Sequence, residues 1–216
     1  MFFPRYCLEC RKQGKYICLD CLSKVHKASF VCPFCKSFSY SGVTHPSCQS
    51  KTILSGAVAI WKYEGVIRKA ILALKYKFAS DIALEIVSLI ELNLDKNHLE
   101  TGTVVPVPLY QDRLRWRGFN QAYILGEAFA KNMNLEFGNA LIRKVNTPPQ
   151  ARLHKSERLR NMRGVFAVNK QFEPNIKGQK VILFDDVWTT GATLEEAARE
   201  LKQNGALEVW GLSIAR

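Results

Sequence analysis

The sequence has no apolar run of the roughly 18 residues that a membrane-spanning helix needs. Residues 1–6 also lack the apolar core of a secretion signal. We therefore expect a cytoplasmic protein without a membrane span. Cysteine is absent after residue 48, and the seven cysteines before it are an odd number, which argues against a closed set of disulfides. The 216 residues, 47% of them hydrophobic, exclude a disordered chain and suffice for one full domain and a small second one.

Acidic residues are scarce, because 19 Asp and Glu stand against 31 Lys and Arg and leave a net charge of +12. The excess is uneven: residues 1–55 carry +6, residues 56–136 carry +1 and residues 137–216 carry +5. A basic protein favours polyanionic ligands such as nucleic acid or phosphorylated small molecules. The same charge can also serve solubility alone, so charge by itself does not choose between these explanations.

The cysteines are spaced as pairs of metal ligands. A two-residue spacing lets two side chains converge on one ion from a tight turn, and a tetrahedral zinc site needs two such turns. The first two pairs could form one site and the last two a second site, which would then be Cys3His. An interleaved arrangement, in which the first pair joins the third, stays open. We expect one or two structural zinc ions, because a segment of about 50 residues builds little core unaided. The candidate ligands are Cys7, Cys10, Cys18, Cys21, Cys32, Cys35, His45 and Cys48.

Aromatic residues are frequent in the same segment, among them Tyr6, Phe38 and Tyr40. Together with nearby lysines they would suit stacking on single-stranded bases between phosphate contacts. Packing against the rest of the chain explains the same aromatics equally well.

After the cysteines, predicted strands and helices alternate along the chain. This order predicts an α/β domain with a parallel sheet, in which ligands bind at the carboxyl edge of the strands. We expect strands at 57–63, 103–108, 165–168, 181–184 and 208–215, helices at 66–74, 82–94, 119–132 and 194–203, and a basic loop at 111–118.

The stretch VILFDDVWTTGAT (181–193) carries the sharpest chemical signal. Backbone N–H groups and threonine hydroxyls at the start of a helix can cradle a phosphate. The carboxylates of Asp185 and Asp186 can accept hydrogen bonds from a sugar diol or bind magnesium. Phosphate and diol together indicate a ribose 5-phosphate, whereas the alternative is a capped helix N-terminus without a ligand. The cradle residues are Thr189, Thr190, Gly191, Ala192 and Thr193.

Two groups of basic residues complete the candidate sites. Arg113, Arg115 and Arg117 alternate in the loop after a central strand and could bind pyrophosphate or a nucleic-acid backbone, or form a solvated loop. Segment 143–163 contains a single acidic residue and is either a mobile lid or a DNA groove. Its candidate nucleic-acid ligands are Arg143, Lys144, Arg152, Lys155, Arg158, Arg160 and Arg163.

Stretch 181–193 resembles the phosphoribosyl pyrophosphate (PRPP) loop of type I phosphoribosyltransferases. Over its whole length the chain resembles the ComF family, in which a zinc finger precedes a phosphoribosyltransferase-type domain. This second resemblance rests on the cysteine pairs, VVPVPL (104–109), RLRWRGFNQA (113–122), the spaced Arg143, Gln150, Arg158, Asn161 and Phe166, and stretch 181–193.

The resemblance implies a zinc-binding module at 1–54, similar to a double zinc ribbon, and a phosphoribosyltransferase-like domain at 55–216. By position, Asp185 and Asp186 would face the ribose hydroxyls with Mg²⁺, and residues 189–193 would bind the 5-phosphate. If the protein is active, the two aspartates and Arg117 would be its catalytic residues.

The ComF family is associated with natural transformation and the handling of incoming single-stranded DNA. We therefore expect a cytoplasmic protein that binds PRPP and Mg²⁺, handles single-stranded DNA and contacts other DNA-uptake proteins. Two alternatives stay open: an active phosphoribosyltransferase with an unidentified acceptor, and a zinc-finger regulator that senses PRPP.

Overall fold

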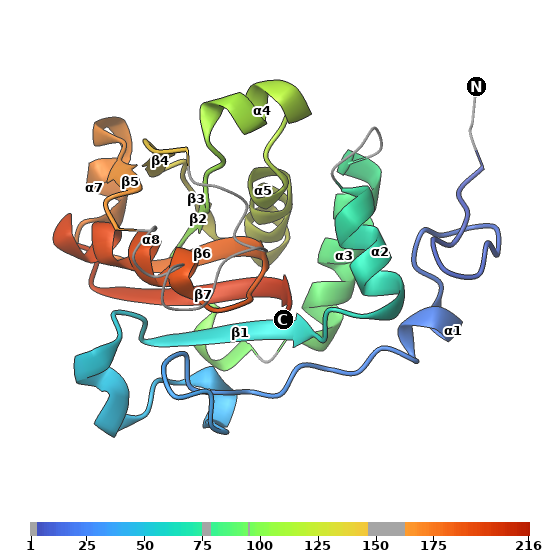
Figure 1. The fold of residues 1–216 in the computed structure, drawn as a ribbon, viewed down its shortest axis with the longest axis horizontal. Helices are drawn as coiled ribbons and strands as arrows, with labels where there is room; N and C mark the ends of the chain where they lie inside the picture. Colours follow the sequence, from blue (N-terminus) through green and yellow to red (C-terminus); the bar gives the residue numbers. More distant parts are fainter. Residues whose placement is uncertain (1–3, 75–78, 95, 147–162) are drawn as a thin grey trace.

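A five-stranded parallel sheet forms the centre of the protein (Figure 1). The computed structural model describes residues 4–74, 79–94, 96–146 and 163–216. The predicted parallel α/β fold is confirmed. The strands lie in the order β1 (Gly56–Trp61), β7 (Glu208–Ala215), β6 (Lys180–Val187), β2 (Thr103–Pro106) and β3 (Glu136–Phe137).

Helices cover both faces of the sheet, which explains why its central strands are continuous apolar runs. On one face, Ile182 and Phe184 of β6 belong to the core beneath α2, α3 and α5. On the other face, Val181 and Leu183 belong to the core beneath α8. These helices span Gly65–Ala73 (α2), Ala79–Asn93 (α3), Gln121–Met133 (α5) and Ala192–Gln203 (α8).

Shorter elements surround the carboxyl edge and the periphery. Strands β4 (Leu141–Arg143) and β5 (Phe166–Val168) form an antiparallel pair outside the main sheet. The remaining helices are α1 (Leu19–Leu22), α4 (Gln111–Arg117) and α7 (Glu173–Ile176), with 3-10 turns η1 (Tyr40–Gly42), η2 (Pro46–Lys51), η3 (Lys96–His98) and η5 (Lys170–Phe172). None of the helices in the described ranges combines the length and the apolarity that crossing a bilayer requires.

Three local predictions were wrong, one in the type of element and two in the bounds of an element. Residues 111–117 are not a loop but helix α4, which ends where Gly118 adopts a left-handed φ of 82°. The predicted strand 181–184 is longer, because β6 stays paired with β7 until Val187 meets Ala215. Asp185 and Asp186 therefore lie in the strand and not in the following loop. Helix α8 likewise begins earlier than predicted, at Ala192.

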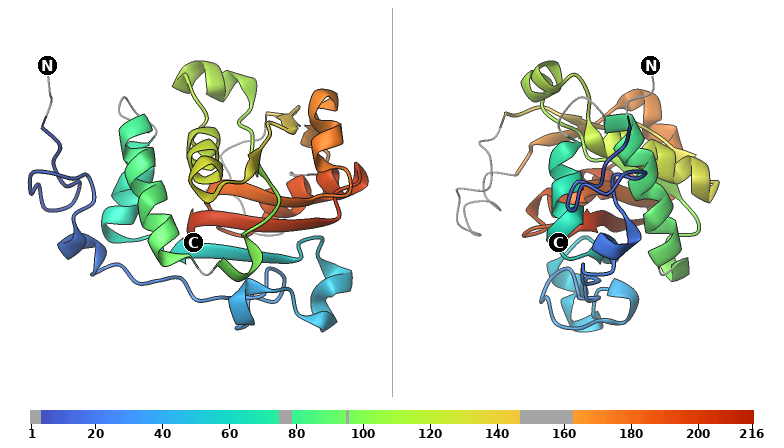
Figure 2. Two further views of the ribbon diagram at one scale, coloured as in Figure 1. Left: turned by 180° about the vertical axis from the view of Figure 1, so that it is seen from behind. Right: turned by 90° about the vertical axis from the view of Figure 1, so that its right-hand side faces the viewer.

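The cysteine-containing segment runs along the outer edge of the sheet (Figures 1 and 2). Its first part lies beside α3, where the backbone N–H of Ile17 donates to Glu85 at 2.7 Å. An extended stretch then follows the end of β1, and the Ala28 N–H donates to Ile60 O at 3.0 Å. The last part reaches the start of β1 through an antiparallel bridge between Val43 and Gly56. This segment covers edge strand β1 at both ends.

Candidate functional site

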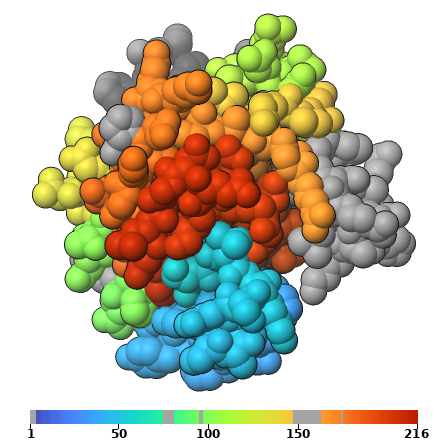
Figure 3. Space-filling view, turned by 90° about the vertical axis from the view of Figure 1, so that its left-hand side faces the viewer, coloured from blue at the N-terminus to red at the C-terminus, as the bar shows by residue number. Residues whose placement is uncertain are grey.

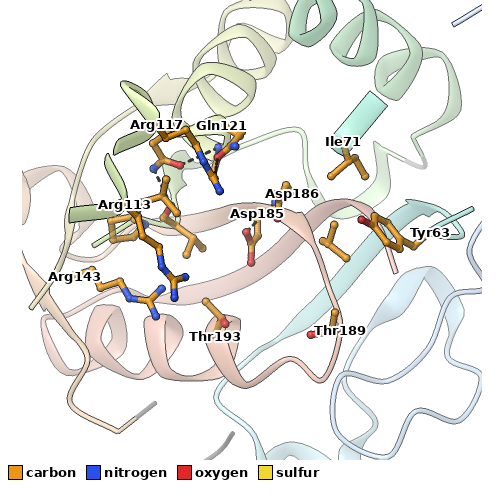
Figure 4. A pocket seen from close by; sticks show the side chains of 16 residues that line it. Tyr63, Ile71, Arg113, Arg117, Gln121, Arg143, Asp185, Asp186, Thr189 and Thr193 are labelled. Carbon is orange, nitrogen blue, oxygen red and sulfur yellow. Dashed lines mark hydrogen bonds between the residues drawn. The ribbon is translucent and has the colours of Figure 1, made fainter. Parts of the chain in front are cut away.

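A cavity of about 410 Å³ opens at the carboxyl edge of the sheet (Figure 4). This volume is within the usual range for small-molecule sites. Its walls come from segments that are distant in the sequence: the end of β6, the turn before α8, helices α2, α4 and α5, and strand β4. The cavity therefore lies where an α/β sheet of this type places its ligands.

Asp185 and Asp186 form the acidic part of the cavity. The backbone N–H of Asp186 donates to Asp185 Oδ1 at 2.9 Å. Burial of the Asp185 carboxyl, followed by the charge of Asp186, raises the pKa of Asp185 to about 8. A divalent cation would favour the ionised forms of both carboxylates, and oxygen ligands of this kind suit Mg²⁺. The donor set therefore fits magnesium together with the hydroxyls of a sugar.

Residues 189–193, which we call the phosphate loop, comprise the turn after β6 and the first two residues of α8. Gly191 has a φ of 89° and is the N-cap residue of the helix. Thr190 Oγ1 accepts a hydrogen bond from the Ala192 N–H at 3.4 Å. Thr189 and Thr193 line the cavity, whereas the three residues between them are not part of the described lining. The loop thus presents a helix N-terminus and two hydroxyls to the cavity.

The three arginines of α4 divide between two faces of the helix. Arg113 and Arg117 are four residues apart, share a face and line the cavity. Arg115 lies two residues from each, is exposed and is not part of the described lining. The alternation seen in the sequence would have placed all three together only in an extended loop.

Arg113 and Arg117 form a cationic wall of the cavity, and Gln121 of α5 anchors this wall. Arg117 Nη1 donates to its Oε1 at 2.6 Å (Figure 4). The Gln121 side chain is only 3% exposed, and its Nε2 has no hydrogen-bond partner among the described residues. Buried amide donors are nearly always paired, so this one points to an acceptor that a ligand would supply.

Arg143 belongs to the cavity, unlike the basic residues that follow it. It is 9% exposed, and its guanidinium points toward the same space as that of Arg113 (Figure 4). Burial, and then the charge of Arg113, lowers the pKa of Arg143. Lys144 and Arg163 are exposed. The other basic residues predicted for this segment lie outside the described residues: Arg152, Lys155, Arg158 and Arg160.

Tyr63 and Ile71 line the cavity but were given no site role from the sequence. Tyr63 follows β1, so its position at the carboxyl edge could have been inferred from the strand assignment. Ile71 repeats with the apolar face of α2 and carries no signal beyond core packing. Asn120 also lines the cavity, and it caps the next helix, as a polar side chain at this position of the sequence can. It is the N-cap of α5, where its Oδ1 accepts from the Ala122 N–H at 3.1 Å.

The candidate zinc ligands fall into two separate groups. The first cluster contains Cys7, Cys10, Cys18 and Cys21, and the second contains Cys32, Cys35, His45 and Cys48. Within each cluster the ligand atoms lie within 4.8 Å of one another. Four ligands on one tetrahedral zinc ion would lie roughly 3.8 Å apart, so both groups fit. The interleaved pairing that the sequence left open is excluded.

The second cluster has the supporting contacts of a metal site. His45 Nε2 donates to the Phe38 carbonyl oxygen at 2.9 Å, which leaves Nδ1 of this ring free to bind a metal. Nδ1 lies 3.4 Å from Cys35 Sγ. The backbone N–H of Ser37 lowers the pKa of Cys35 to about 6. Every cysteine is present as a free thiol, so no disulfide competes with metal binding.

Comparison with known proteins places this site in a family context. A family model described as "Phosphoribosyl transferase domain" matches residues 121–210. Competence protein ComFC of Bacillus subtilis is 28% identical over 203 residues, which are 90% of this chain and 81% of that protein. DNA utilization protein YhgH of Escherichia coli K12 is 29% identical over 223 residues, or 97% of this chain and 96% of that protein.

Competence protein F of Haemophilus influenzae is 36% identical over 117 residues, which are 52% of this chain and 50% of that protein. The expected resemblance to the ComF family is confirmed by these matches. The parallel sheet and the matched domain also confirm the fold class, a phosphoribosyltransferase-like α/β domain preceded by a cysteine-rich segment that could bind zinc.

Proposed function

We propose that this relative of the ComF proteins binds PRPP with Mg²⁺ in the cavity and handles single-stranded DNA. One observation carries the first half of the proposal. Paired carboxylates, a phosphate loop and a cationic wall line one cavity, represented by Asp186, Thr193 and Arg117. Each of these groups matches a different part of PRPP.

The parts of PRPP can be assigned to the walls by their chemistry. The carboxylates of Asp185 and Asp186 accept from the ribose hydroxyls and share Mg²⁺, which when bound would offset the charge of the pyrophosphate. Residues 189–193 receive the 5-phosphate. The pyrophosphate lies toward the arginines, where Gln121 Nε2 supplies the donor that now lacks a partner.

The second half of the proposal rests on the surface next to the cavity. Trp116 of α4 is 79% exposed, and Arg115 is its immediate neighbour. Lys144 is exposed and directly follows β4. Two residues later, the side chain of Asn146 donates to Asp112 of α4 at 3.4 Å, which links this segment to α4. An exposed indole between cations suits stacking on unpaired bases. The names of the relatives, which include competence and DNA utilization proteins, support the same role.

We also propose the division of the chain at residue 54, with structural zinc in both clusters. If the protein is a transferase, Asp185, Asp186 and Arg117 are its catalytic residues. The described cavity lining includes Tyr63 and Ile71 opposite the arginines. Any acceptor would therefore enter beside these two side chains.

Equilibrium binding tests the function. The affinity for PRPP is measured with and without single-stranded DNA, and the affinity for single-stranded DNA with and without PRPP. Wild type should bind PRPP only with Mg²⁺, and Asp186→Asn should weaken this binding strongly. Failure of wild type to bind PRPP would reject the first half. DNA binding should weaken steeply with salt, and failure to bind DNA at low salt would reject the second half.

Two measurements separate the alternatives: release of pyrophosphate, and the effect of each ligand on the affinity for the other. A transferase would release pyrophosphate from PRPP only when an acceptor is added. A regulator would show DNA affinity that changes with PRPP, and PRPP affinity that changes with DNA by the same factor.

A further inference from the structure

The second cluster directs a lysine at the phosphate loop. Lys36 directly follows Cys35, and its backbone N–H donates to Cys32 O at 3.0 Å within the metal-binding turn. The turn holds Lys36 in the left-handed region, with a φ of 64°. The same position in the first cluster is Arg11, also with a φ of 64°. The Lys36 Nζ also donates to Pro33 O at 2.5 Å, so the turn that brings the cysteines together holds both ends of this side chain.

The Lys36 ammonium lies against the turn that connects β6 to α8. Its Nζ is 4.4 Å from the centroid of the Trp188 ring. A Cβ atom added at Gly191 would lie 3.5 Å from this Nζ and 2.8 Å from Trp188 Nε1. A positive charge thus lies close to the phosphate loop, although it comes from a segment about 150 residues earlier in the sequence.

Two buried hydrogen-bond donors without partners in the described ranges lie at the same place, one on the Trp188 ring itself and one on Arg216. Trp188 is 3% exposed, and its Nε1 has no hydrogen-bond partner among the described residues. The guanidinium of Arg216 lies 5.0 Å from the ring centroid, and its Nη1 is likewise buried without a hydrogen-bond partner in the described part of the chain. Unpaired buried donors are rare, and a negatively charged ligand nearby would relieve their cost.

A second set of contacts fastens the cysteine-rich segment to the helix after the loop. Glu195, in the first turn of α8, accepts from Thr52 Oγ1 at 2.5 Å and from the Ile53 N–H at 2.8 Å. In the space-filling view, the blue and cyan residues of this segment lie directly against the red residues of the C-terminal part (Figure 3). The segment therefore contacts both sides of the turn and holds Lys36 beside it.

We propose that Lys36, which is not part of the described lining, binds phosphate from beside the cavity and is contributed by the second cluster. This inference rests on the proposed PRPP function and assigns one part of the ligand, the ribose 5-phosphate, to a residue outside the phosphoribosyltransferase-like domain. A cation held against an aromatic ring keeps its charge, so the ammonium strengthens the field that the loop N–H groups present to a dianion. The pyrophosphate, which we assign to Arg117 and Gln121, does not depend on it.

Calorimetric titration with three probes tests this inference: PRPP with Mg²⁺, ribose 5-phosphate, and inorganic pyrophosphate with Mg²⁺. Lys36→Met should weaken ribose 5-phosphate and PRPP about tenfold, the loss expected for one charge-assisted contact. Its affinity for pyrophosphate should equal that of wild type. Lys36→Arg keeps the charge and should recover most of the lost affinity.

Lys51→Met is the matched control. Lys51 belongs to the same segment, and its ammonium lies over a different ring, Phe34, at 5.7 Å. This variant should bind all three probes as wild type does. Unchanged ribose 5-phosphate affinity in Lys36→Met, or an equal loss for pyrophosphate, would overturn the inference while leaving the proposed function intact. A wild type that binds neither PRPP nor ribose 5-phosphate would overturn both.

Discussion

Arg117 and Gln121 are joined by a 2.6 Å hydrogen bond from the guanidinium to the side-chain amide oxygen, although they belong to different helices. The contact fixes the end of α4 against the first turn of α5. It also directs the Gln121 Nε2 into a cavity where no described side chain accepts from it. Cation and amide are therefore arranged before any ligand arrives, which reduces the entropy lost on binding.

Arg117→Gln should weaken PRPP binding by roughly 10- to 100-fold, because a charge-assisted contact to the pyrophosphate is lost. Arg115→Gln is the matched control, since it removes the same charge from the outer face of the same helix. Titration calorimetry with PRPP and Mg²⁺ compares the two variants. Equal losses of affinity would mean that only the overall charge of α4 matters, and would contradict the assignment of the pyrophosphate.

The raised pKa of Asp185 predicts a dependence of stability on pH. The carboxyl has a pKa of about 8 in the folded protein and about 3.9 in an unfolded chain. Between these values the folded state binds more protons, so the free energy of unfolding falls as pH rises from about 4 to about 8. Asp185→Asn cannot ionise and should escape this loss.

We therefore expect Asp185→Asn to unfold at a higher temperature than wild type at pH 9, by roughly 10 °C. The difference should shrink as pH falls and vanish near pH 4. Thermal unfolding followed by circular dichroism in magnesium-free buffer measures both values, and added Mg²⁺ should narrow the gap at pH 9. If the unfolding temperatures of the two proteins change in parallel across this pH range, burial does not disfavour the ionised form of Asp185.

Trp116→Ala should weaken binding of single-stranded DNA by about tenfold, since loss of one base-stacking contact removes roughly 1–3 kcal/mol. Tyr40→Ala is the informative comparison, because Tyr40 is 74% exposed and belongs to the cysteine-rich segment. Fluorescence anisotropy with a labelled oligonucleotide measures both variants at two salt concentrations. A loss confined to Tyr40→Ala would move the DNA path from α4 to the second cluster.

The sheet could be predicted because its central strands are apolar runs and helical repeats alternate with them along the chain, and both signals are local. Helix α4 was missed because none of its residues is buried, so the sequence shows no periodic apolar face. The role of Arg143 was missed for a different reason. Its place in the cavity depends on the pairing of β4 with β5, more than 20 residues later, and nothing local distinguishes it from exposed Lys144. Lys36 likewise meets Trp188 only through the docking of the second cluster.

The two clusters should each bind one zinc ion, and their removal should have different consequences for the cavity. Cys10→Ser and Cys35→Ser each remove one ligand, so metal analysis should find about one ion per chain in each variant and about two in wild type. Both variants should unfold at lower temperature, because metal binding contributes to folding.

Only Cys35→Ser should also weaken ribose 5-phosphate binding, because the turn that carries Lys36 belongs to the second cluster. The first cluster contacts α3 instead, through Ile17 and Glu85. Cys10→Ser should therefore keep the affinity of wild type for this probe. If both variants lose it equally, the clusters support the fold as a whole. If neither variant loses affinity for ribose 5-phosphate, the phosphate loop binds its phosphate without help from the second cluster. Zinc binding and phosphate binding are then not coupled.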